Sequence, residues 1–128
     1  MTMRIRNDTP PEAWEQERVF DWIRGNEDQY PKLQLAYSTL NGVKLSPGLS
    51  VKMKRQGNKR GVPDIVLPAR SGSGEYSGLY LELKRIKGGK VSKEQKEYIS
   101  RLREENYCAE VVKGHKEAIA RIKRYLAA

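Results

Sequence analysis

The segment at residues 79–84, Leu-Tyr-Leu-Glu-Leu-Lys, constrains the fold of this chain more than any other part of the sequence. Its strict alternation is typical of a β-strand, in which successive side chains point to opposite faces of the sheet. The three leucines share one face, which must meet a hydrophobic core. Tyr80, Glu82 and Lys84 share the other face, so the strand directs a carboxylate and an ammonium away from that core.

The rest of the chain alternates between strand and helix patterns. Further strands are expected at residues 33–38, 64–68 and 108–112, and a Gly/Ser turn at residues 71–74 is expected to form a hairpin tip. Helices are expected between Thr9 and Gly25, between Ser46 and Gly57, after a capping Ser92, and around residues 119–126. This order predicts an α/β fold in which helices flank a mixed β-sheet. No linker or repeat divides the chain, so residues 1–128 are expected to form a single domain.

The composition limits both the partner and the chemistry. Lys and Arg number 25 against 16 Asp and Glu, a net charge of +9, which favours a polyanionic partner such as nucleic acid or an anionic membrane face. A single cysteine, Cys108, excludes an internal disulfide, and a single histidine, His115, disfavours a His/Cys zinc site. Catalysis would therefore depend on carboxylates, lysines or a metal held by oxygen atoms.

No apolar run approaches the roughly 20 residues of a membrane-spanning helix, so no membrane association is expected. The first twelve residues, MTMRIRNDTPPE, also lack the apolar stretch of a signal peptide. We therefore expect a cytoplasmic protein.

The pairing of two strands predicts where the carboxylates meet. If residues 64–68 and 78–82 form an antiparallel hairpin, Asp64 can lie opposite Glu82. Directly opposed residues have Cβ atoms about 4.5–5.5 Å apart, and two carboxylates that close repel unless a cation or a proton lies between them. Such a pair suits an oxygen-ligated Mg²⁺, which also binds substrate phosphate. Lys84 would then lie beside the attacking water or the scissile phosphate.

Asp64 together with the tripeptide Glu82-Leu83-Lys84 resembles the signature of PD-(D/E)XK nucleases. The Gly-Val-Pro-Asp segment at residues 61–64, the E-L-K tripeptide and Gln95 in the next helix resemble specifically the VRR-NUC family of that superfamily. The E-x-x-E-Q-x-x-V-F-x-W run that starts at Glu12 and the Asn41-Gly42 pair are similar to small phage members. The resemblance covers nearly the whole chain.

The resemblance implies a restriction-endonuclease-like core and a metal-dependent DNA nuclease. Asp64, Glu82 and the backbone carbonyl of Leu83 would bind Mg²⁺ or Mn²⁺, Lys84 would orient or deprotonate the attacking water, and Gln95 would face the site. Small stand-alone members of the family are dimeric and are associated with cleavage of branched DNA such as four-way (Holliday) junctions. The resemblance therefore also implies a homodimeric, structure-specific endonuclease.

The family places a glutamate of the first helix near the metal, and two residues compete for this position. Glu12 lies on the helical stripe of Val19 and Ile23 that faces the sheet, whereas Glu15 lies about 60° to its side. We prefer Glu12 as the catalytic and metal-binding residue. Either glutamate could complete a two-metal site, so the sequence leaves open whether one or two metals act.

Each site residue also has a structural interpretation. Asp64 after a proline could be only a turn residue, and Glu82 with Lys84 could be solvent-facing side chains of a half-buried strand. A capping box with Ser92 would account for Gln95 without any catalytic role. Glu12 could merely complement the positive end of its helix.

Two basic clusters flank the expected carboxylate pair, where they would collect phosphates around the metal. The predicted nucleic-acid-binding residues are Lys52, Lys54, Arg55, Lys59 and Arg60 before the pair and Arg85, Lys87 and Lys90 after it. The leading hypothesis is thus a Mg²⁺-dependent DNA nuclease. The alternatives are a non-catalytic basic nucleic-acid-binding module, in which the carboxylates are structural, and an RNA-directed binder or nuclease.

Overall fold

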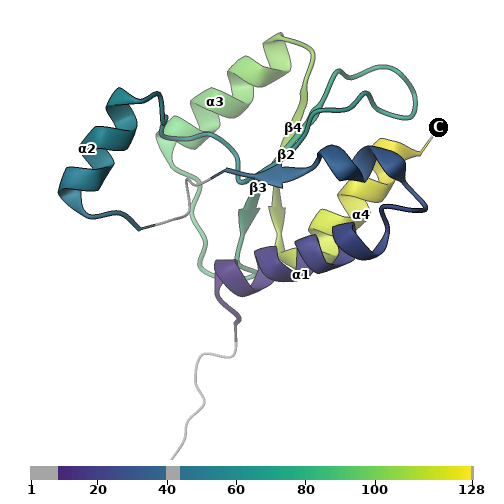
Figure 1. Ribbon diagram of the computed structural model, residues 1–128, viewed down its shortest axis with the longest axis horizontal. Coiled ribbons are helices and arrows are strands. Elements are labelled where there is room, and N and C mark those ends of the chain that lie inside the picture. The colour runs from purple at the N-terminus through teal and green to yellow at the C-terminus, as the bar shows by residue number, and fades with distance from the viewer. Residues whose placement is uncertain (1–8, 40–43, 128) are drawn as a thin grey trace, which may run out of the picture.

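A four-stranded sheet runs through the middle of the computed structural model, which describes residues 9–39 and 44–127 (Figure 1). Its strands lie in the order β1 (Tyr37–Ser38), β2 (Ile65–Leu67), β3 (Leu79–Lys84) and β4 (Cys108–Lys113). The β1–β2 and β2–β3 pairs are antiparallel and the β3–β4 pair is parallel, so the sheet is mixed. The expected α/β fold with a mixed sheet flanked by helices is confirmed. Asn41 and Gly42 lie outside the described residues.

Helices cover the sheet on both sides. Figure 1 shows α1 (Glu12–Gly25) and α4 (Gly114–Leu126) side by side on one face and α3 (Lys93–Glu104) on the other. The helix α2 (Pro47–Arg55) projects away from the sheet, and none of its residues, all of which are described, is buried. None of the described helices is long and apolar enough to cross a membrane.

The leucine face of β3 forms the centre of the hydrophobic core. Leu79, Leu81 and Leu83 are at most 1% exposed. They belong to one buried cluster with Val19 of α1 and Ile122 of α4. Full burial of each such side chain contributes about 1.5–3 kcal/mol, so this face holds α1 and α4 against the sheet.

The opposite face of β3 is also covered. Glu82 is 1% exposed and Lys84 is 8% exposed. The interpretation of these residues as solvent-facing side chains is therefore wrong. Taking a charged side chain out of water is costly unless partners compensate it, so the buried pair needs neighbours of suitable charge.

The predicted strand over residues 33–38 is wrong for most of its length. Pro31–Leu35 form a 3-10 helix, η1, and only Tyr37 and Ser38 of this stretch lie in a strand. Of the alternating apolar residues, Leu33 is buried whereas Leu35 and Tyr37 are 54% and 51% exposed. A short alternating run does not distinguish a strand from a helical turn, and Pro31 suits the first turn of a helix.

The first helix begins later than Thr9. The residue before α1 is Pro11, with no side-chain capping hydrogen bond. The last helix begins earlier than residue 119, because α4 starts at Gly114, directly after β4, and His115 lies in its first turn. Gly114 has φ +77°, a backbone angle that glycine adopts at little cost and that turns the chain from strand into helix.

Candidate metal centre

The β2–β3 pairing brings two carboxylates together. Ile65 lies opposite Leu81, so continuing the register by one residue sets Asp64 opposite Glu82, as the hairpin pattern predicts. The backbone N–H of Leu83 donates a 2.7 Å hydrogen bond to Oδ2 of Asp64, which holds this side chain against the end of β3. Asp64 is 5% exposed, so it is not simply a polar turn residue.

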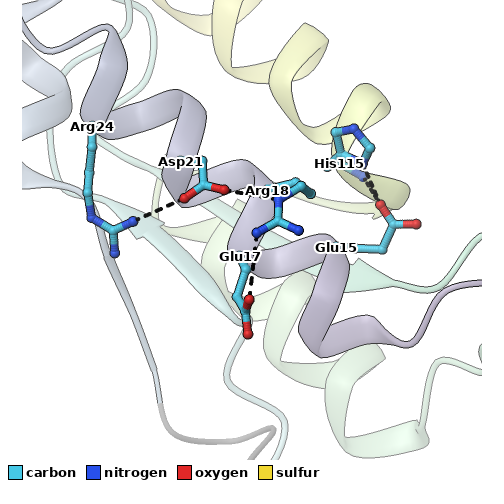
Figure 2. Close-up of polar contacts among 6 residues, drawn as sticks. All are labelled: Glu15, Glu17, Arg18, Asp21, Arg24 and His115. Atoms are coloured by element: carbon cyan, nitrogen blue, oxygen red, sulfur yellow. Dashed lines mark hydrogen bonds and ion pairs between the residues drawn. The ribbon is translucent and has the colours of Figure 1, made fainter.

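Glu12, at the start of α1, is the third member of the cluster. Carboxylate oxygens of Glu12, Asp64 and Glu82 all lie within 4.8 Å of one another. Glu15, the competing residue on α1, is instead fully buried and accepts hydrogen bonds from His115, at 2.8 Å from its backbone N and 2.6 Å from Nδ1 (Figure 2). Glu12 and Glu15, although only three residues apart on α1, therefore contact different groups: Glu12 the other two carboxylates and Glu15 the side chain of His115.

The two carboxylate oxygens of Glu82 have different surroundings. Oε2 accepts a 2.9 Å hydrogen bond from Nε2 of Gln95 and lies 3.3 Å from Nζ of Lys84. Oε1 is buried and has no hydrogen-bond partner among the described residues. A buried acceptor without a partner is uncommon, and here it belongs to the cluster of Glu12, Asp64 and Glu82.

Gln95 serves two neighbours at once. Its side-chain Oε1 accepts from the N–H of Ser92 at 2.8 Å, while the hydroxyl of Ser92 accepts from the N–H of Gln95 at 3.1 Å. This reciprocal pair is the predicted capping box of α3. Because the box uses only Oε1, the amide nitrogen remains free to donate to Glu82, so capping does not exclude a role at the site.

The electrostatics of the cluster favour a bound cation. Burial, together with the charge of Asp64, raises the pKa of Glu82 to about 8, although Lys84 opposes this effect. Burial also raises the pKa of Asp64, and burial followed by the charge of Asp64 raises the pKa of Glu12. Three adjacent acids that resist ionisation need either protons or positive charge between them. A hard divalent cation with oxygen ligands fits this donor set.

The buried Glu15 and the surface charges of α1 form two separate sets of contacts (Figure 2). The Glu15 side chain points to His115 in the first turn of α4, and burial, which by itself raises its pKa, is outweighed by hydrogen bonds from His115 that lower it. Further along α1, Arg18 lies 3.0 Å from Asp21 and 3.6 Å from Glu17. The Glu15–His115 contact therefore joins α1 to α4 and leaves Glu12 to the carboxylate cluster.

The Gly-Val-Pro-Asp segment passes close to the start of α3. Gly61 has φ +86°, and a Cβ atom at this position would lie 2.6 Å from the backbone oxygen of Glu94. Only glycine permits this approach without displacing the backbone. The segment that leads to Asp64 is thereby seated against the helix that supplies Gln95.

The predicted nucleic-acid-binding residues fall into two places. Those of the first cluster lie on α2 and in the loop that follows it, and all are exposed: Lys52, Lys54, Arg55, Lys59 and Arg60. In the second cluster Lys87 and Lys90 are exposed, after the end of β3. Arg85 differs from them, because it is partly buried and donates a 2.9 Å hydrogen bond to the backbone oxygen of Thr9. This contact ties the segment before α1 to the end of β3.

Comparisons with known proteins agree with this architecture. The VRR-NUC domain model matches residues 7–116 of the chain. A solved structure described as "VRR_NUC domain protein" superposes with a TM-score of 0.76 at 30% sequence identity, covering 92% of this chain and 89% of that one. A search of curated proteins found no match. The family match extends over most of the sequence and includes Glu12, Asp64 and Glu82, so the chain belongs to the VRR-NUC domain family, a nuclease-type family.

Proposed function

We propose that this protein is a metal-dependent nuclease that hydrolyses phosphodiester bonds in DNA. The observation that carries the proposal is the convergence of Glu12, Asp64 and Glu82 within 4.8 Å, beside a buried lysine. Membership of a nuclease-type family and the net charge of +9 support a polyanionic substrate.

Mg²⁺ or Mn²⁺ would be held by the three carboxylates and by the backbone carbonyl of Leu83. Oε1 of Glu82, which is buried without a hydrogen-bond partner among the described residues, is available to such a cation. When bound, the metal lowers the pKa of water and stabilises negative charge on phosphate oxygens.

The remaining polar residues act around the carboxylates. Lys84, whose Nζ lies 3.3 Å from Oε2 of Glu82, orients the attacking water and offsets charge that develops on the phosphate. Gln95 is a positioning residue, because its amide holds the same Oε2 by a 2.9 Å hydrogen bond. Hydrolysis adds water across one P–O bond and leaves a phosphomonoester and a hydroxyl end.

Branched DNA, such as a four-way junction, is the proposed substrate, and the protein is proposed to cut it as a homodimeric endonuclease. These finer assignments rest on what is typical of small VRR-NUC proteins. Two copies related by symmetry would present two sites to the opposed strands of a junction. Sedimentation velocity tests the dimer directly, and a monomer at all concentrations would contradict it.

The activity is tested with labelled four-way junction, duplex and single-stranded DNA, each incubated with Mg²⁺, Mn²⁺ or EDTA. We expect cleavage of the junction with either metal and none with EDTA. Glu82→Ala should bind DNA at least as well as the wild type and fail to cut it. Glu104→Gln, which removes one exposed carboxylate at the far end of α3, is the matched control and should cut normally.

If the wild type and Glu82→Ala were equally inert on every substrate with both metals, the protein would be a non-catalytic nucleic-acid-binding module instead. Cleavage of RNA but not of DNA would support an RNA-directed nuclease.

A further inference from the structure

Two grooves of opposite charge lie near the carboxylate cluster. The first, which we call the α1 groove, has a volume of about 740 Å³ and is lined by α1, β1 and Asp64. Its charged lining residues are Glu12, Glu17, Asp21, Arg24, Glu27 and Asp64. The second, the α2–α3 groove, has a volume of about 930 Å³. Its charged lining residues are Lys54, Lys59, Arg60, Glu94, Glu97 and Arg101.

This contrast determines where a polyanion can extend. The α1 groove has five carboxylates and one arginine in its lining, so a phosphate backbone would be repelled from it. Glu12 and Asp64 would be neutralised by a bound metal, and Glu17 and Asp21 lie beside Arg18. The one arginine of the lining, Arg24, lies 3.7 Å from Asp21, so this groove offers a phosphate no unpaired cation among its lining residues. The α2–α3 groove has four cations against two carboxylates, so it attracts phosphates.

The α2–α3 groove is connected to the cluster by two chain segments. Arg60 lines the groove, and the chain continues from it through Gly61 to Asp64. Glu94 also lines the groove, and its neighbour Gln95 donates to Glu82. The close approach of Gly61 to Glu94 fixes these two segments to each other. A strand held at the carboxylates can therefore continue into this groove without crossing the acidic side.

The groove also offers an aromatic surface. Tyr98, one turn of α3 beyond Glu94, lines it and is partly exposed. The opposite wall is α2, where Lys54 is exposed and no residue is buried by the rest of the chain. A cationic groove with an aromatic ring on one wall is the combination that binds single-stranded nucleic acid, since phosphates pair with cations and bases stack on the ring.

We propose that the α2–α3 groove binds the nucleic-acid strand next to the scissile phosphate, with Lys54 and Arg101 on its phosphates and Tyr98 against a base. This assignment rests on the proposed nuclease function. It adds the path that the bound strand follows away from the metal centre. It also adds two residues of α3, Tyr98 and Arg101, to the predicted nucleic-acid contacts.

The test measures binding of a fluorescent single strand and a fluorescent duplex by anisotropy, in EDTA and at several salt concentrations. The double variant Lys54→Ala/Arg101→Ala is compared with Lys123→Ala/Arg124→Ala, which removes the same charge from the distant C-terminal end of α4 (Figure 1). We expect the groove variant to bind about tenfold more weakly than this control, with a smaller dependence of affinity on salt.

Tyr98→Leu removes the ring without changing the charge and should weaken single-strand binding about five- to tenfold with an unchanged salt dependence. Circular dichroism confirms that each variant is folded.

Equal losses of affinity in the groove variant and in the control would overturn the proposal, because the groove would then be an ordinary solvated surface. A groove variant that turns a dimer into a monomer in sedimentation velocity would also overturn it, because a second copy of the chain would be the occupant. Binding in EDTA needs no catalysis, so the two proposals fail separately. If the groove variant binds more weakly but the wild type does not cleave DNA, only the nuclease function is refuted. If the wild type cleaves DNA but the groove variant binds as well as the control, only the role of the groove is refuted.

Discussion

Gln95 and Glu82 are joined by a 2.9 Å hydrogen bond between Nε2 and Oε2, while the other end of the Gln95 side chain closes the capping box of α3. One side chain thus starts a helix and holds a buried carboxylate of β3. The start of α3 and the carboxylate cluster are therefore mechanically linked, and the two roles can be separated by mutation.

Replacing Gln95 by alanine should lower both stability and cleavage, whereas replacing Ser92 should lower only stability. Both changes disrupt the capping box and should cost about 1 kcal/mol in the free energy of unfolding. Only Gln95→Ala also removes the donor to Glu82, so we expect it to cut about tenfold more slowly than Ser92→Ala, as for groups that orient metal ligands. Urea denaturation and initial cleavage rates give both quantities. Equal cleavage rates for Gln95→Ala and Ser92→Ala would show that Gln95 does not position Glu82 for catalysis.

The metal-free protein should lose stability as the pH rises. The pKa of Glu82 is raised from its usual 4.5 to about 8 by burial and by Asp64, so the folded state retains a proton that the unfolded state releases above pH 4.5. Proton binding therefore stabilises the fold fully below pH 4.5, and this contribution disappears as the pH rises through about 8.

Glu82→Gln should remove the part of this dependence that Glu82 contributes. At pH 8.5 in EDTA we expect its free energy of unfolding to exceed that of the wild type by about 1 kcal/mol or more, with little difference at pH 4.5. Urea titrations over this range measure the effect, and Glu104→Gln controls for the loss of one charge. Parallel profiles for the wild type and Glu82→Gln would show that Glu82 titrates normally.

Substitution of the two α1 glutamates should separate metal binding from folding. Glu12→Gln should weaken Mn²⁺ binding by about tenfold or more, because Glu12 lies within the carboxylate cluster. Glu15→Gln should leave Mn²⁺ affinity unchanged and lower the melting temperature, because it alters the buried contact with His115. Thermal melts over a series of MnCl₂ concentrations yield both results, since a ligand of the folded state raises the melting temperature according to its affinity. The reverse pattern would assign the metal to Glu15.

Alanine at Gly61 should be more harmful than alanine at Gly57. Both glycines have a positive φ, of +86° and +107°, but only a Cβ at Gly61 would meet other atoms, 2.6 Å from the backbone oxygen of Glu94. Backbone strain alone should cost about 1 kcal/mol at Gly57, and the added collision should raise the cost at Gly61 to about 2 kcal/mol or more. Chemical denaturation measures both, and cleavage assays should show loss only for Gly61→Ala. Equal effects would mean that the close approach to α3 is unimportant.

Local patterns were enough to predict the elements that carry the site. Residues 79–84 form β3 with the expected bounds, and its alternation separates the leucines from Glu82 and Lys84. The antiparallel register with β2 is confirmed, because the side-chain period of two and the position of the turn leave few other pairings. The capping box at Ser92 is confirmed for the same reason, since its hydrogen bonds join residues three apart in the chain.

The run of residues 33–38 shows where local patterns fail. Its alternation suits a strand, yet its first half forms part of η1, in which Leu33 is the one buried residue. A helical turn and a strand of this length differ too little in local energy for the sequence to choose between them, so packing against the rest of the chain decides.

The amino-acid sequence by itself determined the period of each main strand and helix, the pairing of Asp64 with Glu82 and the excess of positive charge, because these depend on neighbours in the chain or on composition. The helical stripe of the first helix favoured Glu12 over Glu15, and the tertiary structure decided that Glu12 completes the cluster while Glu15 contacts His115. Only the tertiary structure decided which residues line the acidic and the basic groove. These outcomes depend on how α1, α3 and α4 are rotated and placed against the sheet. That arrangement follows from core packing between residues far apart in the chain, which no local pattern encodes.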